Sequence, residues 1–228
     1  MRRYREAVVL AGGFGARLAH VVPDVCKPMA PVAGRPFLRF VLDQLAANGI
    51  ERSVVADGYR REQIEKHFGD FYRGMDVVYS PESEPLFTGG AVKQAMAKCE
   101  GDWVFVMNGD TWFDVNFGAM EAAAVGAPAG VKAIIAVKRM RDFERYGTVD
   151  VSGAGTITAF HEKMPCVEGL INAGVYLIRR DVLAKMPRKF SLESDFFEVV
   201  VPDGALCTVE CAGDFIDIGV PEDYELAQ

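Results

Sequence analysis

The stretch Glu6–Leu18, "EAVVLAGGFGARL", joins a short apolar run to a glycine-rich turn. An unbroken apolar run followed by glycines is typical of a buried strand that ends in a loop. Gly12, Gly13 and Gly15 leave the backbone free to point several N–H groups at one anion. The stretch therefore has the features of a phosphate-binding loop at the end of a strand.

The glycine spacing nevertheless fits neither of two familiar nucleotide-binding patterns. The dinucleotide pattern G-x-G-x-x-G would place its third glycine at Leu18. A P-loop lysine follows its last glycine directly, whereas Lys27 comes later and precedes Pro28. Arg17 and Lys27 still supply positive charge near the turn. Taken alone, the stretch leaves two interpretations open, a phosphate-binding loop or a plain strand-to-loop turn.

The composition is that of a globular protein whose ligands are small molecules. Hydrophobic residues make up 50% of the 228 residues, and no run approaches the roughly 20 apolar residues of a membrane helix. The net charge of −7 and the scattered basic residues argue against nucleic-acid binding. The first apolar run is too short for a signal peptide. Five cysteines without a C-x-x-C pair, with only three histidines, exclude zinc-finger spacing and favour a cytoplasmic location.

Apolar runs alternate with helical patterns through the first half of the chain. After the first run come "RSVVADG", "DVVYS" and "DWVFVMNGD", separated by expected helices within 36–50, at 60–68 and at 89–99. Continuous apolar strands separated by helices indicate a parallel sheet that is buried on both faces. Ligands bind beyond the carboxyl ends of such strands. The glycine turn, "SPESEPLFTGGA" and "MNGD" are therefore expected on one rim.

The second half of the chain has the pattern of a strand-rich lobe. From Val131 onward, "KAIIAVKRM", "RYGTVDV", "TITAFHEK" and "INAGVYLIRR" precede an expected helix at 192–200 and two further strands. Because no composition shift or linker marks a boundary, we expect one domain. The predicted fold is α/β, a Rossmann-like and mostly parallel sheet flanked by helices, with a strand-rich C-terminal lobe.

Several polar side chains stand next to these predicted strands. Asp110 and Asp217 each follow an apolar strand, and two carboxylates can bind Mg²⁺ together with substrate phosphates, although each Asp can equally cap a loop. Glu162 and Lys163 are neighbours in an extended segment, so their side chains face opposite ways. One could contact a ligand while the other supports the fold, or the two could form a surface ion pair. Asn172 enters an apolar strand and needs polar partners, from a polyhydroxyl ligand or from a neighbouring loop.

These motifs together resemble the sugar-1-phosphate nucleotidylyltransferases over essentially the whole chain. The matching strings, in family order, are "LAGGFGARL", "KP", "EPLFTGGA", "NGD", "FHEK", "NAGVY" and "DIGVPEDY". More narrowly, "KPMAPVAGRPFL", "DFERYGTV", "EGLINAGVYL" and "FIDIGVPEDY" resemble the D-glycero-D-manno-heptose 1-phosphate guanylyltransferases, although enzymes for mannose 1-phosphate or other sugars share most of these strings.

The resemblance implies a reaction and a set of site residues. A sugar-1-phosphate oxygen would attack the α-phosphorus of GTP in line, with Mg²⁺ as cofactor and pyrophosphate as leaving group. The enzyme would be cytoplasmic, and a homodimer is possible. The implied nucleotide-binding half is 1–125, and the sugar-phosphate-binding half is 126–228. The implied catalytic residues are Arg17, Lys27 and Asp110; the metal ligands are Asp110 and Asp217. The implied nucleotide-binding residues are Leu10, Gly12, Gly13, Gly15, Glu82, Glu84, Thr88 and Gly89, and those for the sugar phosphate are Gly147, Glu162, Lys163 and Asn172.

Base selection is expected in "SPESEPLFTGGA". A carboxylate can accept hydrogen bonds from both N1–H and the exocyclic amine of guanine, which makes either Glu82 or Glu84 a candidate guanine reader. The chain departs from the family pattern here, because Phe87 stands where relatives usually have glycine. We expect its side chain either to reshape the base pocket or, if its φ is negative, to pack outward.

Two rival functions come from other classes. A regulatory protein could bind a sugar nucleotide without turnover, but it would have no need of the charge set Arg17, Lys27, Asp110 and Asp217. A glycosyltransferase typically carries D-x-D after a strand, whereas "NGD" here is followed by Asp114 at the wrong spacing. The sequence therefore favours the nucleotidyltransferase.

Overall fold

The structure, a computed structural model, describes residues 4–15, 17–18 and 20–228. Its strands are β1 (Glu6–Leu10), β2 (Pro31–Val32), β3 (Arg35–Pro36), β4 (Arg52–Ala56), β5 (Phe71–Tyr72), β6 (Met75–Tyr79), β7 (Trp103–Asn108), β8 (Thr111–Phe113), β9 (Ala133–Phe143), β10 (Thr148–Val151), β11 (Ile157–His161), β12 (Cys166–Arg179), β13 (Leu206–Glu210) and β14 (Phe215–Asp217). The α-helices are α1 (Phe37–Ala47), α2 (Arg61–Phe68), α3 (Phe87–Met96), α4 (Phe117–Gly126), α5 (Glu198–Val200) and α6 (Pro221–Leu226). Short 3₁₀ turns are η1 (Lys27–Met29), η2 (Arg180–Leu183) and η4 (Val201–Asp203), and η3 (Glu193–Phe197) is a π-helical turn.

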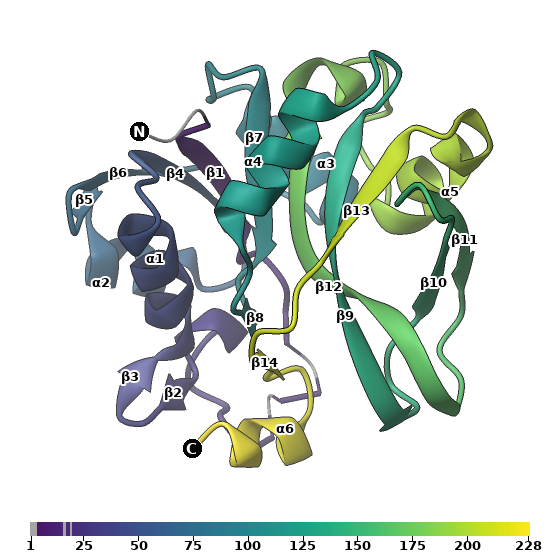
Figure 1. Ribbon diagram of the computed structural model, residues 1–228. Coiled ribbons are helices and arrows are strands. Elements are labelled where there is room, and N and C mark those ends of the chain that lie inside the picture. The colour runs from purple at the N-terminus through teal and green to yellow at the C-terminus, as the bar shows by residue number, and fades with distance from the viewer. Residues whose placement is uncertain (1–3, 16, 19) are drawn as a thin grey trace.

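A ten-stranded sheet extends through both halves of the described chain, with eight strands in the order β11-β10-β12-β7-β1-β4-β6-β5 and two off this path, β9 paired with β12 and β13 paired with β9. At its centre, β1 pairs in parallel with β4 and β7, and β4 pairs in parallel with β6. The antiparallel strand β12 joins β7 to the second half, where it also pairs with β9 and β10. Figure 1 shows the long β9 and β12 strands beside this parallel centre.

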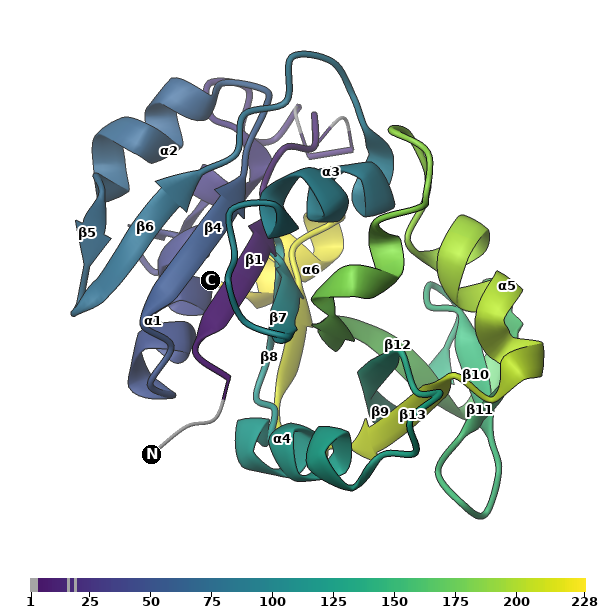
Figure 2. The ribbon, with the colours of Figure 1, turned by 90° about the horizontal axis from the view of Figure 1, so that it is seen from above.

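The central strands are buried on both faces. In β1, Val9 belongs to a core beneath α1, α2 and α4, whereas Val8 belongs to a core beneath α3, η3 and α5. Successive side chains of a strand point to opposite faces, so an unbroken apolar run fills both cores. Figure 1 shows α1 and α4 in front of the sheet and α3 behind it, and Figure 2 shows β6, β4, β1 and β7 as neighbours. The predicted α/β class with a parallel centre and a strand-rich C-terminal lobe is confirmed.

Two helices differ from their sequence expectation. The helix expected at 192–200 is divided into the π-helical turn η3 and the short helix α5. Helix α4 was not expected, because its sequence "FGAMEAAAVG" is almost uniformly apolar and has no polar face to produce a helical period. Asn116 caps α4, with its side-chain oxygen accepting a hydrogen bond from Ala119 N at 2.9 Å.

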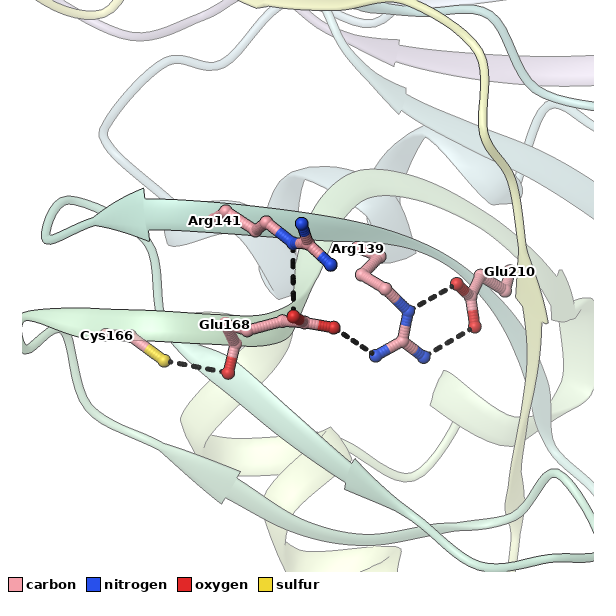
Figure 3. Close-up of polar contacts among 5 residues, drawn as sticks. All are labelled: Arg139, Arg141, Cys166, Glu168 and Glu210. Atoms are coloured by element: carbon pink, nitrogen blue, oxygen red, sulfur yellow. Dashed lines mark hydrogen bonds and ion pairs between the residues drawn. The ribbon is translucent and has the colours of Figure 1, made fainter.

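An exposed ion-pair cluster links the strands of the second half (Figure 3). Arg139 of β9 donates two hydrogen bonds to Glu210 of β13, at 2.9 and 3.1 Å, and a third to Glu168 of β12 at 3.5 Å. Arg141 also donates to Glu168, at 3.1 Å, from the directly opposite position of β9. Each solvent-exposed ion pair contributes only about 0–1 kcal/mol to the free energy of unfolding. The cluster therefore adds little stability, and its main effect is to favour the pairing of β9 with β12 and β13.

Two further observations concern membrane-spanning helices and cysteines. Within the described residues, no helix has the length and apolar character needed to cross a bilayer. All five cysteines are free thiols, and Cys26, Cys99 and Cys211 are buried.

The packing of Phe105 gives a test of the core. Phe105 of β7 is completely buried and lies against Phe117 of α4, with ring centroids 4.8 Å apart. Phe105→Ala should lower the free energy of unfolding by about 3–5 kcal/mol in urea denaturation, because it leaves a cavity. The control Phe71→Ala removes a ring that is 62% exposed and should change stability by less than about 0.5 kcal/mol. Equal effects of the two substitutions would contradict this placement of the core.

Candidate active site

The parallel centre brings the ends of three strands to one level. Leu10, the last residue of β1, is paired with Ala56 of β4 and with Asn108 of β7. Main-chain hydrogen bonds continue past the strands, from Ala11 N to Ala56 O and from Gly109 N to Leu10 O, both at 2.8 Å. The loops that follow these strands therefore leave the sheet together, as expected for the ligand rim of a parallel sheet.

A first cavity of about 430 Å³ opens on this rim. Six of the predicted nucleotide-binding residues line it: Leu10, Gly12, Gly13, Glu82, Glu84 and Thr88. A Cβ atom on Gly12 would lie 2.3 Å from Glu82 Oε1, so a larger residue here would displace the Glu82 carboxylate. The Glu82 carboxylate also accepts a hydrogen bond from Leu86 N at 3.0 Å. Burial raises the pKa of Glu82, and the Leu86 hydrogen bond opposes that rise.

The structure distinguishes the two candidate base readers. The carboxylate of Glu84 forms ion pairs with Arg188 at 2.8 Å and with Lys189 at 2.5 Å. Lys189, with a smaller contribution from Arg188, holds the pKa of Glu84 below its usual value. The carboxylate of Glu82 lies instead beside the glycine turn. Of the two candidates, Glu82 is therefore the residue that lines the cavity without a basic partner among the described residues.

Lys27, Asp110 and Asp217 form a charged cluster at the rim. Lys27 Nζ forms an ion pair with Asp110 Oδ2. Asp217 Oδ1 accepts a hydrogen bond from Gly219 N at 2.7 Å, and a Cβ on Gly219 would lie 3.2 Å from Lys27 Nζ, so Asp217 and Lys27 meet around this glycine. Burial and the Asp110 carboxylate raise the pKa of Asp217, whereas Lys27 lowers it. Gly15 packs on Lys27 and has a φ of +60°, a conformation that suits glycine.

The carboxylate pair fits a divalent cation that also binds phosphate. Burial is the main cause of the raised pKa of Asp217, and repulsion by the Asp110 carboxylate adds to it; a cation between the two carboxylates would relieve that repulsion. The described residues contain no cluster of three or more His, Cys, Asp or Glu side chains suited to a metal. Mg²⁺ commonly binds through one or two carboxylates and completes its shell with substrate phosphates and water. The donor set here is of that kind.

A second cavity, of about 470 Å³, adjoins the first. It is lined by Asp217 and by all four residues predicted for the sugar phosphate, which are Gly147, Glu162, Lys163 and Asn172. Asn108 lines both cavities, so they meet at the end of β7. Gly174 has a φ of +74°, and a Cβ there would lie 2.4 Å from Asn108 Nδ2. The two sets of predicted residues therefore face a common junction.

A hydrogen-bonded chain that the sequence did not predict runs from one cavity to the other. Thr88 Oγ1 donates to Glu193 Oε2 at 2.7 Å, and the Tyr176 hydroxyl donates to Glu193 Oε1 at 3.4 Å. Asn172 Nδ2 in turn donates to the Tyr176 hydroxyl at 3.1 Å. Glu193 lies in the π-helical turn η3, and such turns often occur at functional sites. Glu193 falls within the helix expected at 192–200 and was not among the site residues predicted from the sequence.

Three further residues were singled out from the sequence, and two of them, Arg17 and Gly89, are predicted site residues. The side chain of Arg17 is exposed. Gly89 is buried under Phe190, where a Cβ would lie 2.2 Å from the ring, and its N–H donates to Phe190 O at 3.0 Å. Phe87 has a positive φ of +60°, so the outward packing expected for a negative φ does not apply, and it lines the first cavity.

The fold agrees with the comparison to known proteins. A family model described as nucleotidyl transferase matches residues 6–227. The chain belongs to the nucleotidyl transferase family. This finding confirms the resemblance drawn from the seven ordered motifs of the sequence.

Relatives within the nucleotidyl transferase family include guanylyltransferases. The D-glycero-alpha-D-manno-heptose 1-phosphate guanylyltransferase of Aneurinibacillus thermoaerophilus is 40% identical over 225 residues, covering 98% of this chain and 96% of the relative. The enzyme of that name from Campylobacter jejuni is 38% identical over 224 residues, covering 96% of each chain. A crystal structure of HddC from Yersinia pseudotuberculosis complexed with GMP-PN superposes with a TM-score of 0.86 at 31% identity, covering 98% of this chain and 97% of that one.

Asp57, which follows β4 on the same rim, gives a test of electrostatics. Its side chain is fully buried, and burial together with the nearby Glu65 raises its pKa from 3.8 to about 6. Between these pH values the folded state binds a proton that the unfolded state releases, so stability falls as pH rises through the window. Relative to the wild type, Asp57→Asn should gain about 3 kcal/mol of unfolding free energy between pH 4 and pH 7.5 in urea denaturation.

Asp76→Asn is the control for this pH dependence, since Asp76 is exposed on the neighbouring strand β6. Its stability relative to the wild type should stay constant over the same range. The prediction is wrong if the Asp57 variant follows the pH dependence of the wild type.

Proposed function

We propose that the protein transfers GMP from GTP to D-glycero-α-D-manno-heptose 1-phosphate, forming GDP-heptose and pyrophosphate. The observation that carries the proposal is that the two cavities meet at Asn108, where Asp110 lines the first cavity, Asp217 lines the second, and Lys27 lies beside both carboxylates. A donor nucleotide in one cavity and a sugar phosphate in the other would bring their phosphates together at this charged cluster. The names of the two guanylyltransferase relatives, both about as long as this chain, support the choice of substrates.

In the proposed reaction, a phosphate oxygen of the sugar phosphate attacks the α-phosphorus of GTP. The P–O bond to the β-phosphate breaks, and the electron pair leaves with pyrophosphate. The attacking oxygen is already ionised, so no general base is needed. Lys27 neutralises charge at the α-phosphate, and its ion pair with Asp110 fixes the position of its ammonium group. Arg17, exposed beside the glycine turn, is the proposed partner of the β- and γ-phosphates.

Guanine recognition is proposed for Glu82. Its carboxylate lies at the glycine turn and, unlike Glu84, has no arginine or lysine partner among the described residues. An ionised carboxylate accepts hydrogen bonds from both N1–H and the exocyclic amine of guanine, a donor pair that uracil and cytosine lack. A crystal structure of the relative HddC is complexed with GMP-PN, which supports the choice of a guanine nucleotide.

The sugar is proposed to bind in the second cavity. Glu162, Asn172 and Glu193 offer oxygen and amide groups for its hydroxyls, and Lys163 offers a cation for its phosphate. Mg²⁺ is the proposed cofactor, held by Asp110 and Asp217, and when bound it would neutralise charge on the reacting phosphates. On this proposal, residues 1–125 bind the nucleotide and residues 126–228 bind the sugar phosphate.

The setting of the enzyme is also proposed. Five free thiols support a reducing compartment such as the cytoplasm. A product of this kind, GDP-heptose, would be used for surface polysaccharide. The homodimer remains a prediction.

A substrate matrix tests the proposal directly. Purified protein is incubated with Mg²⁺, each of GTP, ATP, CTP and UTP, and 1-phosphates of manno-heptose, mannose and glucose, and pyrophosphate release is measured. The largest kcat/KM is expected for GTP with manno-heptose 1-phosphate. Faster turnover of mannose 1-phosphate would change only the proposed sugar substrate. Faster turnover of another NTP would change only the proposed base specificity. No turnover in any combination would favour the alternative, a regulatory protein that binds sugar nucleotides.

Lys27→Ala tests the charged cluster. We expect kcat to fall by about 10²–10³-fold, because one positioned positive charge is removed from the transition state. The control Lys66→Ala removes an exposed lysine of α2 and should leave kcat unchanged. Thermal unfolding of both variants checks that the fold persists. An unchanged kcat in a folded Lys27→Ala protein would remove Lys27 from the mechanism.

A further inference from the structure

Three aromatic side chains surround the first cavity. Phe14 of the glycine turn, Tyr59 of the loop after β4 and Phe87 at the start of α3 all line it. The Phe14 and Tyr59 rings lie 5.2 Å apart between centroids, with 38° between their planes. Phe14 is 61% exposed and Phe87 is 65% exposed. The cavity is thus lined both by the half-buried carboxylate of Glu82 and by large apolar rings.

Phe87 is held in a backbone conformation that its side chain does not favour. Its φ of +60° is in the left-handed region, which a bulky residue rarely adopts outside strained or functional sites. Its neighbours fix the chain there, because Leu86 is buried and Leu86 O accepts a hydrogen bond from Phe190 N at 3.3 Å. The Phe87 ring is mostly exposed, so burial within the protein does little to offset this strain.

We propose that Phe87 is a specificity-determining residue that stacks, together with Phe14, on the purine base of the bound nucleotide. The inference rests on the proposed function, because it assigns the first cavity to the nucleotide. Aromatic rings stack on the faces of bases, and a purine offers a larger face than a pyrimidine. Glu82 then contacts the edge of the base while the rings cover its face. The strained backbone is retained because the exposed ring becomes buried only when nucleotide binds.

The proposal predicts opposite effects on binding and on stability. Phe87→Gly removes both the ring and the strain, so the urea midpoint of unfolding should equal or exceed that of the wild type. Its Kd for GTP, measured by calorimetry without sugar phosphate, should rise about tenfold through loss of one stacking contact. A residue with only a structural role would not produce weaker binding in a protein that is equally or more stable.

Two further variants and a control complete the experiment. Phe87→Leu keeps a bulky side chain but loses the ring, so GTP binding should weaken more than UTP binding, and Phe87→Tyr should retain wild-type selectivity. Phe71→Ala, which removes an exposed ring of β5, should leave nucleotide binding unchanged. Wild-type GTP affinity in the Gly and Leu variants would overturn the proposal. Because binding is measured without turnover, its failure is distinguishable from failure of the proposed reaction.

Discussion

The parallel pairing of β1 with β4 and β7 is the constraint on which the site depends. Leu10 is level with both Ala56 and Asn108, and the hydrogen bond from Gly109 N to Leu10 O extends that alignment into the loops. A Cβ on Gly109 would lie 2.7 Å from Leu10 O, so the approach itself requires glycine. A shift in this register would separate the glycine turn from the loop that carries Asp110, and the two cavities would no longer meet.

The second half of the chain completes the site by crossing to the same edge. Strand β12 pairs antiparallel with β7 and so brings Gly174 next to Asn108, while β14 pairs with β8 and brings Asp217 beside Lys27. Close approach again depends on glycine, at Gly174 against Asn108 and at Gly219 between Asp217 and Lys27. The site is therefore formed by both halves of the chain together, and neither half forms it alone. The Thr88–Glu193–Tyr176–Asn172 chain connects the first cavity to the second through hydrogen bonds, so the walls of the two cavities support each other.

Much of this arrangement was predictable because it depends on local chemistry. The apolar run ending at Leu10 must be a buried strand, and glycines directly after it must form a turn. Asp110 follows the buried strand β7, which places it on the rim of the parallel sheet. Asp217 is instead the last residue of β14, which pairs with β8 in a separate antiparallel sheet, so the parallel-sheet rule does not account for its position beside Lys27. Helix α4 was missed because its uniformly apolar sequence has no helical period, and η3 was missed because a π-helical turn has no sequence signal distinct from an α-helix.

The sequence by itself determined the α/β class, the rim loops, the family resemblance and the set of charged residues, since strand burial, glycine turns and residue types are properties of short stretches of chain. Tertiary structure alone decided which of these residues meet. Glu82 and Glu84 are only two positions apart, yet one lies against Gly12 and the other pairs with Arg188 and Lys189. The positive φ of Phe87 likewise could not be read from its own side chain. Both outcomes depend on neighbours that are distant in the sequence, because long-range packing, and not local preference, fixes where a loop side chain points.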